Sequence, residues 1–154
     1  MLISQTSEYA LRAMAWLASV PPERLVRARD LSEGAEIPLH YLSKILRRLV
    51  LADLLLSQKG QGGGFMLARP AGEIRFLDVL AAMDNYLSPG RCAFGWGTCD
   101  ESNPCMLHES WSELNETLLR WATGNTLADV QSKATESVWS GRPGASASGR
   151  RDEV

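Results

Sequence analysis

The 154-residue chain lacks the features that mark membrane, secreted or catalytic proteins. No apolar run approaches the roughly 20 residues that cross a bilayer, and the N-terminal stretch lacks the basic start of a secretory signal. Its Ser, His and Asp residues show no spacing typical of nucleophilic catalysis. We therefore expect a cytoplasmic protein that is not an enzyme.

The chain also has little net charge, -2 at pH 7, which excludes a bulk basic surface for nucleic acid. The charge is unevenly divided. Residues 1–80 contain 10 Lys and Arg against 8 Asp and Glu, whereas residues 81–154 contain 6 against 10. A nucleic-acid partner would have to be met by a local basic patch in the first half of the chain.

Cysteine is scarce, and its 3 copies all lie between Cys92 and Cys105. Cys92, Cys99 and Cys105, together with His108, form the pattern C-x6-C-x5-C-x2-H. An odd number of cysteines cannot pair completely, and cytosolic proteins rarely form disulfides. Thiolate and imidazole are donors that hold iron–sulfur clusters or zinc. The pattern predicts a metal or cluster site, and the spacing alone leaves its occupant open.

The first part of the chain is expected to be mainly α-helical with a small β-hairpin. Apolar residues recur at helical spacing in four segments, at residues 5–19, 28–34, 38–51 and 74–86. Two short strands, at 54–57 and 65–68, flank a glycine-rich tip. This order of elements predicts a winged helix-turn-helix over residues 1–86, in which the hairpin is the wing.

The helix at 38–51 and the wing are the expected DNA-binding elements. An exposed helix can enter the major groove and present side chains to base edges. Residues 38–59 have a local net charge of +3, from four Lys or Arg against Asp53, which suits phosphate contacts. A solvated helix face beside a structural hairpin is the alternative. The expected contact residues are His40, Tyr41, Ser43, Lys44, Arg47, Arg48, Lys59 and Gln61.

The second part of the chain divides into three regions. Residues 87–108 form the expected ligand loop. Residues 106–133 hold a long helix and a short one, in which Trp111 and Trp121 have the spacing of apolar interface anchors. Trp96, between two glycines in the loop, either shields the ligand site or fills a gap. Residues 134–154 have little to bury, and we expect them to be disordered.

Four stretches resemble the IscR/NsrR-type family of winged-helix transcriptional regulators, some of which carry an iron–sulfur cluster. The stretches are residues 1–17, 37–49, 54–70 and 92–111, and the run GGGFMLARP at residues 62–70 is the most specific of them. The resemblance covers about residues 1–133. It implies a homodimer formed through the long helix near residues 106–122, which binds an operator with two half-sites under control of the cluster.

The resemblance implies ligation by Cys92, Cys99, Cys105 and His108, as in members that hold a [2Fe–2S] cluster. A [4Fe–4S] cluster completed by Glu8 of the partner subunit is a second interpretation, and zinc in a Cys3His site is a third. The signal would be cluster supply, nitric oxide or redox state. Two further hypotheses are a thiol-based regulator without metal and a small iron–sulfur redox protein.

Two departures from the family pattern are visible. The usual wing tip is Arg-Gly-Pro-Gly-Gly-Gly, whereas this chain has Lys59 and Gln61 in place of the Arg and the Pro. Lys cannot make the bidentate contacts of Arg, so the wing is expected to contact DNA differently. The first cysteine interval is six residues long where the family usually has five.

Overall fold

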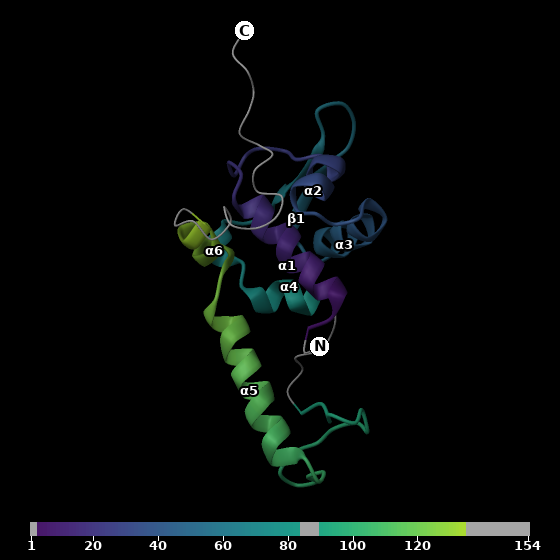
Figure 1. Ribbon diagram of the computed structural model, residues 1–154, viewed down its shortest axis with the longest axis vertical. Helices are drawn as coiled ribbons and strands as arrows, with labels where there is room; N and C mark the ends of the chain where they lie inside the picture. Colours follow the sequence, from purple (N-terminus) through teal and green to yellow (C-terminus); the bar gives the residue numbers. More distant parts are fainter. Residues whose placement is uncertain (1–2, 84–89, 135–154) are drawn as a thin grey trace.

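The computed structural model describes residues 3–83 and 90–134, and within them it is mainly helical with one two-stranded antiparallel sheet. Figure 1 shows a compact upper body and a long helix that leaves it. The elements, in chain order, are α1 Gln5–Ala18, α2 Ala28–Gly34, α3 Leu39–Leu51, β1 Leu55–Gln58, β2 Gly64–Leu67, η1 Ala71–Glu73, α4 Phe76–Met83, α5 His108–Gly124 and α6 Leu127–Ala134. The expected mainly α fold with a β-hairpin wing is confirmed.

The boundaries differ from expectation mainly in the second part of the chain. The long helix expected from residue 106 begins at His108 and continues to Gly124. The end of the helix expected at 74–86, the start of the ligand loop at 87–89 and the tail at 135–154 lie outside the described residues.

Helix α1 occupies the centre of the upper body. Ser4 caps its start, because the Ser7 amide donates to Ser4 Oγ at 3.2 Å. Its buried face consists mostly of small apolar side chains, and α2, α3, α4 and α6 all contact the helix. The buried apolar residues of α1 are Ala10, Ala13, Met14, Leu17 and Ala18. Because alanine side chains are short, several helices can approach α1 closely.

The turn between α2 and α3 sets the direction of α3. Glu36 adopts a φ of 54°, the left-handed conformation that ends α2 abruptly. Arg12 of α1 donates to the Glu36 carbonyl at 3.3 Å, and Ser32 Oγ donates to the Ile37 carbonyl at 2.6 Å. Helix α3 then buries Leu42, Ile45, Leu46 and Leu49. Its opposite face is therefore left to solvent.

The wing is a tight antiparallel hairpin. Leu55 pairs with Leu67 at its base and Gln58 with Gly64 at its tip. Val26, which precedes α2, extends the pairing through backbone hydrogen bonds of 2.9 and 2.8 Å with Phe65. A Cβ atom at Gly63 would lie 2.2 Å from the Gln58 carbonyl oxygen, so the tip can only be closed with glycine there.

Helix α5 is fixed to the body at its C-terminal end. The Phe76 amide donates to the Asn125 carbonyl and the Leu127 amide to the Ile74 carbonyl, both at 3.0 Å. Ala122 is buried and packs against Leu80 of α4. At the other end of α5 lies the loop that contains the cysteines (Figure 1). Of the helices that the structure describes, none combines the length and the apolar character needed to cross a membrane.

The packing of α2 on α1 generates a stability prediction. A Cβ atom at Gly34, the last residue of α2, would lie 2.5 Å from the indole ring of Trp16. We expect Gly34→Ala to lower the free energy of unfolding by about 1–3 kcal/mol, because the ring and α2 must move apart. Urea or thermal denaturation followed by circular dichroism measures the change.

Gly124→Ala is the matched control. Gly124 is also the last residue of its helix, but no atom lies within 4 Å of a Cβ built there. Its substitution should leave stability unchanged or slightly raised. Equal losses for both variants would contradict the assigned contact between Gly34 and Trp16.

Candidate DNA-binding surface and thiol site

The exposed face of α3 is basic and contains no carboxylate. His40, Tyr41, Ser43, Lys44, Arg47 and Arg48 are all exposed. The rings of His40 and Tyr41 lie 4.1 Å apart, and Tyr41 also approaches Tyr9 of α1 at 6.1 Å. These contacts hold the two aromatic side chains together at the start of the helix. Ser43 donates its hydroxyl to the Leu39 carbonyl at 2.8 Å, which leaves the oxygen free to accept only.

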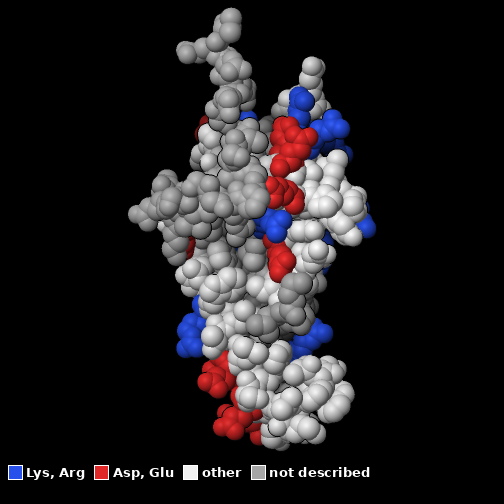
Figure 2. All heavy atoms as spheres, in the orientation of Figure 1, with Lys and Arg blue, Asp and Glu red and all other residues white. Residues whose placement is uncertain are grey.

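The wing and α3 lie in the same part of the molecule. Lys59 and Gln61 of the wing tip are exposed, so every expected contact residue is accessible. Figure 2 shows Lys and Arg at the surface of the upper right part, where α2, α3 and the wing lie, interspersed with some Asp and Glu. At the lower end, over α5, Asp and Glu predominate (Figure 2). A polyanion is therefore favoured at α3 and the wing and disfavoured at the start of α5.

The three cysteines converge in the loop before α5. The sulfur atoms of Cys92, Cys99 and Cys105 all lie within 4.8 Å of one another. Cys92 and Cys99 are buried, Cys105 is half-buried, and none of the three forms a disulfide. The spacing of the cysteines predicts that they act together, and the fold brings all three to one point.

The backbone between Cys92 and Cys99 folds back on itself. The Cys92 amide donates to the Gly97 carbonyl at 3.1 Å, and the Cys99 amide donates to the Gly90 carbonyl at 2.7 Å. Gly95 and Gly97 have φ values of 72° and 95°, a region that favours glycine. The six-residue interval is thus closed by two glycines, and both thiols point to the same place.

Asp100 closes the second interval, between Cys99 and Cys105. Its Oδ1 accepts hydrogen bonds from the Ser102 hydroxyl at 2.5 Å and from the amides of Ser102 and Asn103 at 2.9 and 3.0 Å. These bonds, the Ser102 hydroxyl foremost, hold the pKa of the Asp100 carboxyl below its ordinary value. The sequence prediction did not include Asp100, although Asp with Ser and Asn two and three residues later is a typical turn signal.

His108, the first residue of α5, stands at the edge of the thiol group. Its Nδ1 lies 3.1 Å from the Cys99 sulfur. Its amide donates to the Cys105 carbonyl at 3.0 Å, while the Cys105 amide donates to the Cys99 sulfur at 3.4 Å. The imidazole is thus adjacent to the site, as the sequence predicts, and whether it is a ligand stays a prediction.

The thiols of Cys92 and Cys105 differ in acidity. Backbone hydrogen bonds, first from Phe94 and then from Trp96, lower the pKa of Cys92 despite its burial. At Cys105 the Leu107 amide acts in the same direction, but burial and the neighbouring Cys99 and Cys92 raise the pKa overall. Cys92 is therefore converted more readily than Cys105 into the thiolate that a metal requires.

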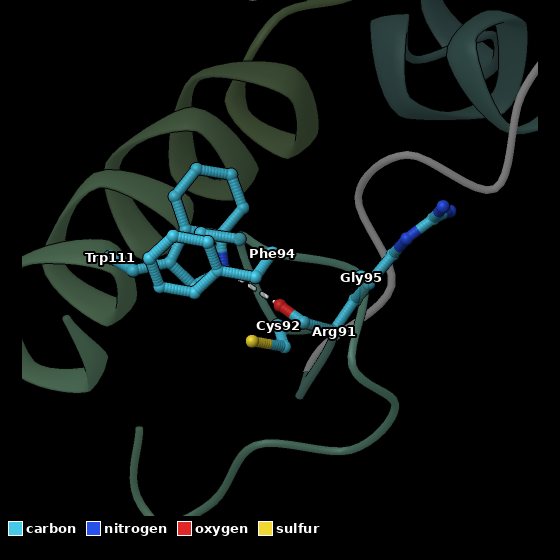
Figure 3. A pocket seen from close by; sticks show the side chains of 6 residues that line it. Arg91, Cys92, Phe94, Gly95 and Trp111 are labelled. Carbon is cyan, nitrogen blue, oxygen red and sulfur yellow. Dashed lines mark hydrogen bonds between the residues drawn. The ribbon is translucent and has the colours of Figure 1, made fainter. Parts of the chain in front are cut away.

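Three tryptophans have partners within the chain, and the expected role of Trp111 and Trp121 in a dimer stays a prediction. Trp111 connects α5 with the ligand loop, because its Nε1 donates to the Arg91 carbonyl at 2.7 Å (Figure 3). Trp121 packs edge-on against Phe76 of α4 with ring centroids 5.3 Å apart, so it holds α5 to the body. Trp96 is 72% exposed and stacks on Phe94 at 4.6 Å. It covers one wall of the loop rather than filling an internal gap.

The site fits an inorganic group with thiolate ligands. Three sulfurs converge, two of them buried, and an imidazole nitrogen lies beside one of them. Thiolate with imidazole is the donor set of some iron–sulfur clusters and of Cys3His zinc sites. Glu8 belongs to α1 in the upper body, whereas the thiols lie in the loop beside the start of α5, and Glu8 is not among the donors grouped with them (Figure 1). A Glu8 ligand would therefore have to come from a second copy of the chain.

The Asp100 turn yields a prediction about metal binding. Asp100→Ala removes the acceptor that brings Cys99 and Cys105 together, so we expect the affinity of the metal-free protein for Co²⁺ to fall roughly tenfold. Asp100→Asn keeps an oxygen acceptor and should lose much less. Titration followed by the thiolate-to-Co²⁺ absorption band measures both. Equal affinity in the wild type and Asp100→Ala would show that the turn does not organise the site.

Comparison with known proteins identifies the family of this chain. The model of the Rrf2 family, described as an iron-dependent transcriptional regulator, matches residues 3–133. A putative HTH-type transcriptional regulator of Aquifex aeolicus is 31% identical over 132 residues, which cover 84% of this chain and 91% of that protein. The transcriptional regulator IscR of Cronobacter sakazakii is 32% identical over 130 residues, with 84% and 80% covered.

Solved structures share the fold. T. potens IscR matches with a TM-score of 0.71 at 24% identity, over 88% of this chain and 90% of that one. CymR, the global cysteine regulator of B. subtilis, matches with a TM-score of 0.70 at 22% identity, over 85% and 96%. Both the family and the relatives are DNA-binding regulators and not enzymes. This chain belongs to the Rrf2 family of winged helix-turn-helix transcriptional regulators.

Proposed function

We propose that this protein is a homodimeric regulator whose affinity for its operator is controlled by an iron–sulfur cluster at the thiol site. The observation that carries the proposal is the convergence of three thiols within 4.8 Å in a winged-helix chain. The description of the family as iron-dependent favours iron over zinc. The protein would act in the cytoplasm, where the chromosome of a bacterial cell lies.

Cys92, Cys99 and Cys105 are the proposed ligands, with His108 as the fourth. The place of His108 beside Cys99 supports a [2Fe–2S] cluster with one imidazole ligand. A [4Fe–4S] cluster completed by Glu8 of a second copy is the alternative. Either cluster would supply reversible one-electron chemistry and reactivity towards nitric oxide, and it would tie the two halves of the loop to the start of α5.

The proposed DNA contacts divide by position. His40, Tyr41, Ser43 and Lys44 are near the N-terminal end of α3, where base contacts usually fall in this class of motif. Arg47 and Arg48 lie one turn later and would contact phosphates, while Lys59 and Gln61 would reach the backbone or the minor groove from the wing. The basic face of α3 supports this assignment.

The proposed dimer forms through α5. Leu114 is 41% exposed and Trp121 38% exposed, and Leu118 of the same helix is only half-buried. Such apolar side chains on a helix that leaves the body are suited to packing against a second α5. Two copies related by a two-fold axis would present two α3 helices to two operator half-sites.

The same helix would connect the thiol site with the DNA-binding surface. Its 17 residues span about 25 Å, and its C-terminal end is bonded to the segment around α4. A change in the order of the loop at one end of α5 would therefore alter its position relative to the body and to the second copy. A coupling of a few kcal/mol is enough to change operator occupancy strongly.

Purification without oxygen tests the cluster. We expect a coloured protein containing iron and acid-labile sulfide, in which replacing Cys92, Cys99 or Cys105 with Ser abolishes the visible absorption. A colourless protein that stays free of iron after anaerobic reconstitution would remove the cluster from the proposal. Stoichiometric zinc in that protein would instead support a structural Cys3His site.

Two further variants identify the fourth ligand. His108→Ala should shift the visible spectrum and speed the loss of the cluster if the imidazole is a ligand, whereas Glu8→Gln should leave both unchanged. The reverse result would assign the fourth position to Glu8 of a second copy. Because His108 and Glu8 lie in different parts of the fold, one substitution should not disturb the other position.

DNA binding is tested on fragments selected from a random DNA pool. Arg47→Ala should weaken binding and reduce the slope of log affinity against log salt by about one, because one phosphate contact is lost. Arg120→Ala removes an exposed cation of α5 and serves as the control. Equal effects of both variants, or none, would contradict the role of α3.

A further inference from the structure

A pocket of about 230 Å³ opens beside Cys92, between the ligand loop and α5. Figure 3 shows the Cys92 sulfur turned to the side on which Trp111 and Phe94 lie. The residues that line the pocket are Arg91, Cys92, Ala93, Phe94, Gly95 and Trp111. Of the three cysteines, Cys92 alone lines this pocket, and it is otherwise buried in the protein.

The lining favours an uncharged occupant. The indole N–H of Trp111 is already donated to the Arg91 carbonyl, so the ring offers its faces rather than a donor. No carboxylate lines the pocket, and the guanidinium of Arg91 points away from the two aromatic rings (Figure 3). An ionised ligand would give up hydration without gaining an opposite charge.

The dimensions of the pocket limit the occupant to a small molecule. Its volume is below the roughly 300–1,000 Å³ of sites for drug-sized ligands, yet well above what one water needs. Phe94 forms one wall and is braced from outside by the stacked ring of Trp96. Gly95, next to Phe94, also lines the pocket, and nothing lies within 4 Å of a Cβ built there.

We infer that this pocket is an access site through which small uncharged molecules reach the Cys92 sulfur. If the three thiols hold a cluster, as the proposed function states, the pocket also leads such molecules to that cluster. This extension rests on the proposed function. Cys92 is then the first ligand residue that a small uncharged signal molecule would contact. Phe94, which stacks on Trp96, and Ala93 are the lining residues whose size limits what the pocket can admit.

The test measures alkylation of the reduced, metal-free full-length protein. Iodoacetamide forms a carbon–sulfur bond with a thiolate and releases iodide, and tandem mass spectrometry of peptides gives separate rates for Cys92 and Cys105. We expect Ala93→Leu to slow the alkylation of Cys92 several-fold, because the larger side chain fills the pocket, and to leave Cys105 unchanged. Ala81→Leu, on an exposed position of α4 outside the pocket, is the matched control.

A second variant covers the case in which Ala93→Leu does not fold. Phe94→Ala removes a wall, so Cys92 should become reactive towards a bulky dye-labelled maleimide that is slow with the wild type. An unchanged rate at Cys92 in the folded Ala93→Leu variant, or a wild-type Cys92 that reacts readily with the bulky reagent, would overturn the inference.

Charge is tested with iodoacetate, which resembles iodoacetamide in size but carries a negative charge. The preference for the uncharged reagent should be stronger at Cys92 than at Cys105. A preference for iodoacetate at Cys92 would overturn the inference in favour of an anion site. None of these measurements needs iron, so an iron-free protein would refute the proposed cluster and leave the pocket to be judged by the alkylation rates.

Discussion

The burial of one face of α1 is the constraint on which the rest of this structure depends. Four helices pack on α1, and they can do so because alanine occupies much of its buried face. Met14 and Leu17 fill the space between the packed helices and are almost fully buried. Large-to-small changes at such positions typically cost about 2–5 kcal/mol. Arg12, on the same helix, donates to the turn that directs α3, so the orientation of the basic face of α3 follows from the packing of α1.

Local patterns in the sequence are sufficient to predict most of the fold. The period of apolar residues locates α1, α2 and α3 to within about a residue, because each buries a single stripe. The hairpin is predictable from its glycines, and Gly63 shows why, since a side chain there would collide with the Gln58 carbonyl unless the tip shifted. The sequence pattern places the beginning of α5 too early, because Met106 and Leu107 are apolar but exposed, and they precede the helix.

The candidate site is predictable only in part. Four donors in a short interval indicate a common site, and the fold brings the three thiols together. The means by which they are brought together cannot be predicted from spacing. Trp111 looks like an interface anchor in the sequence, but its partner is a backbone carbonyl 20 residues away. The role of Asp100 rests on hydrogen bonds from the nearby amides of Ser102 and Asn103. In the sequence, Asp100 looks like any other acidic residue of an exposed loop.

The distribution of charge along the molecule also affects how it meets DNA. Helix α3 carries three cations and no acid, whereas α5 carries Glu109, Glu113 and Glu116 against Arg120. Within the described residues, positive and negative charge is therefore separated along the long axis, although the net charge of the chain is only -2. In the field of a polyanion such a molecule turns its α3 end forward before contact. Under the proposed function, fewer encounters would then occur in a wrong orientation, and the thiol end of the molecule would stay away from the duplex.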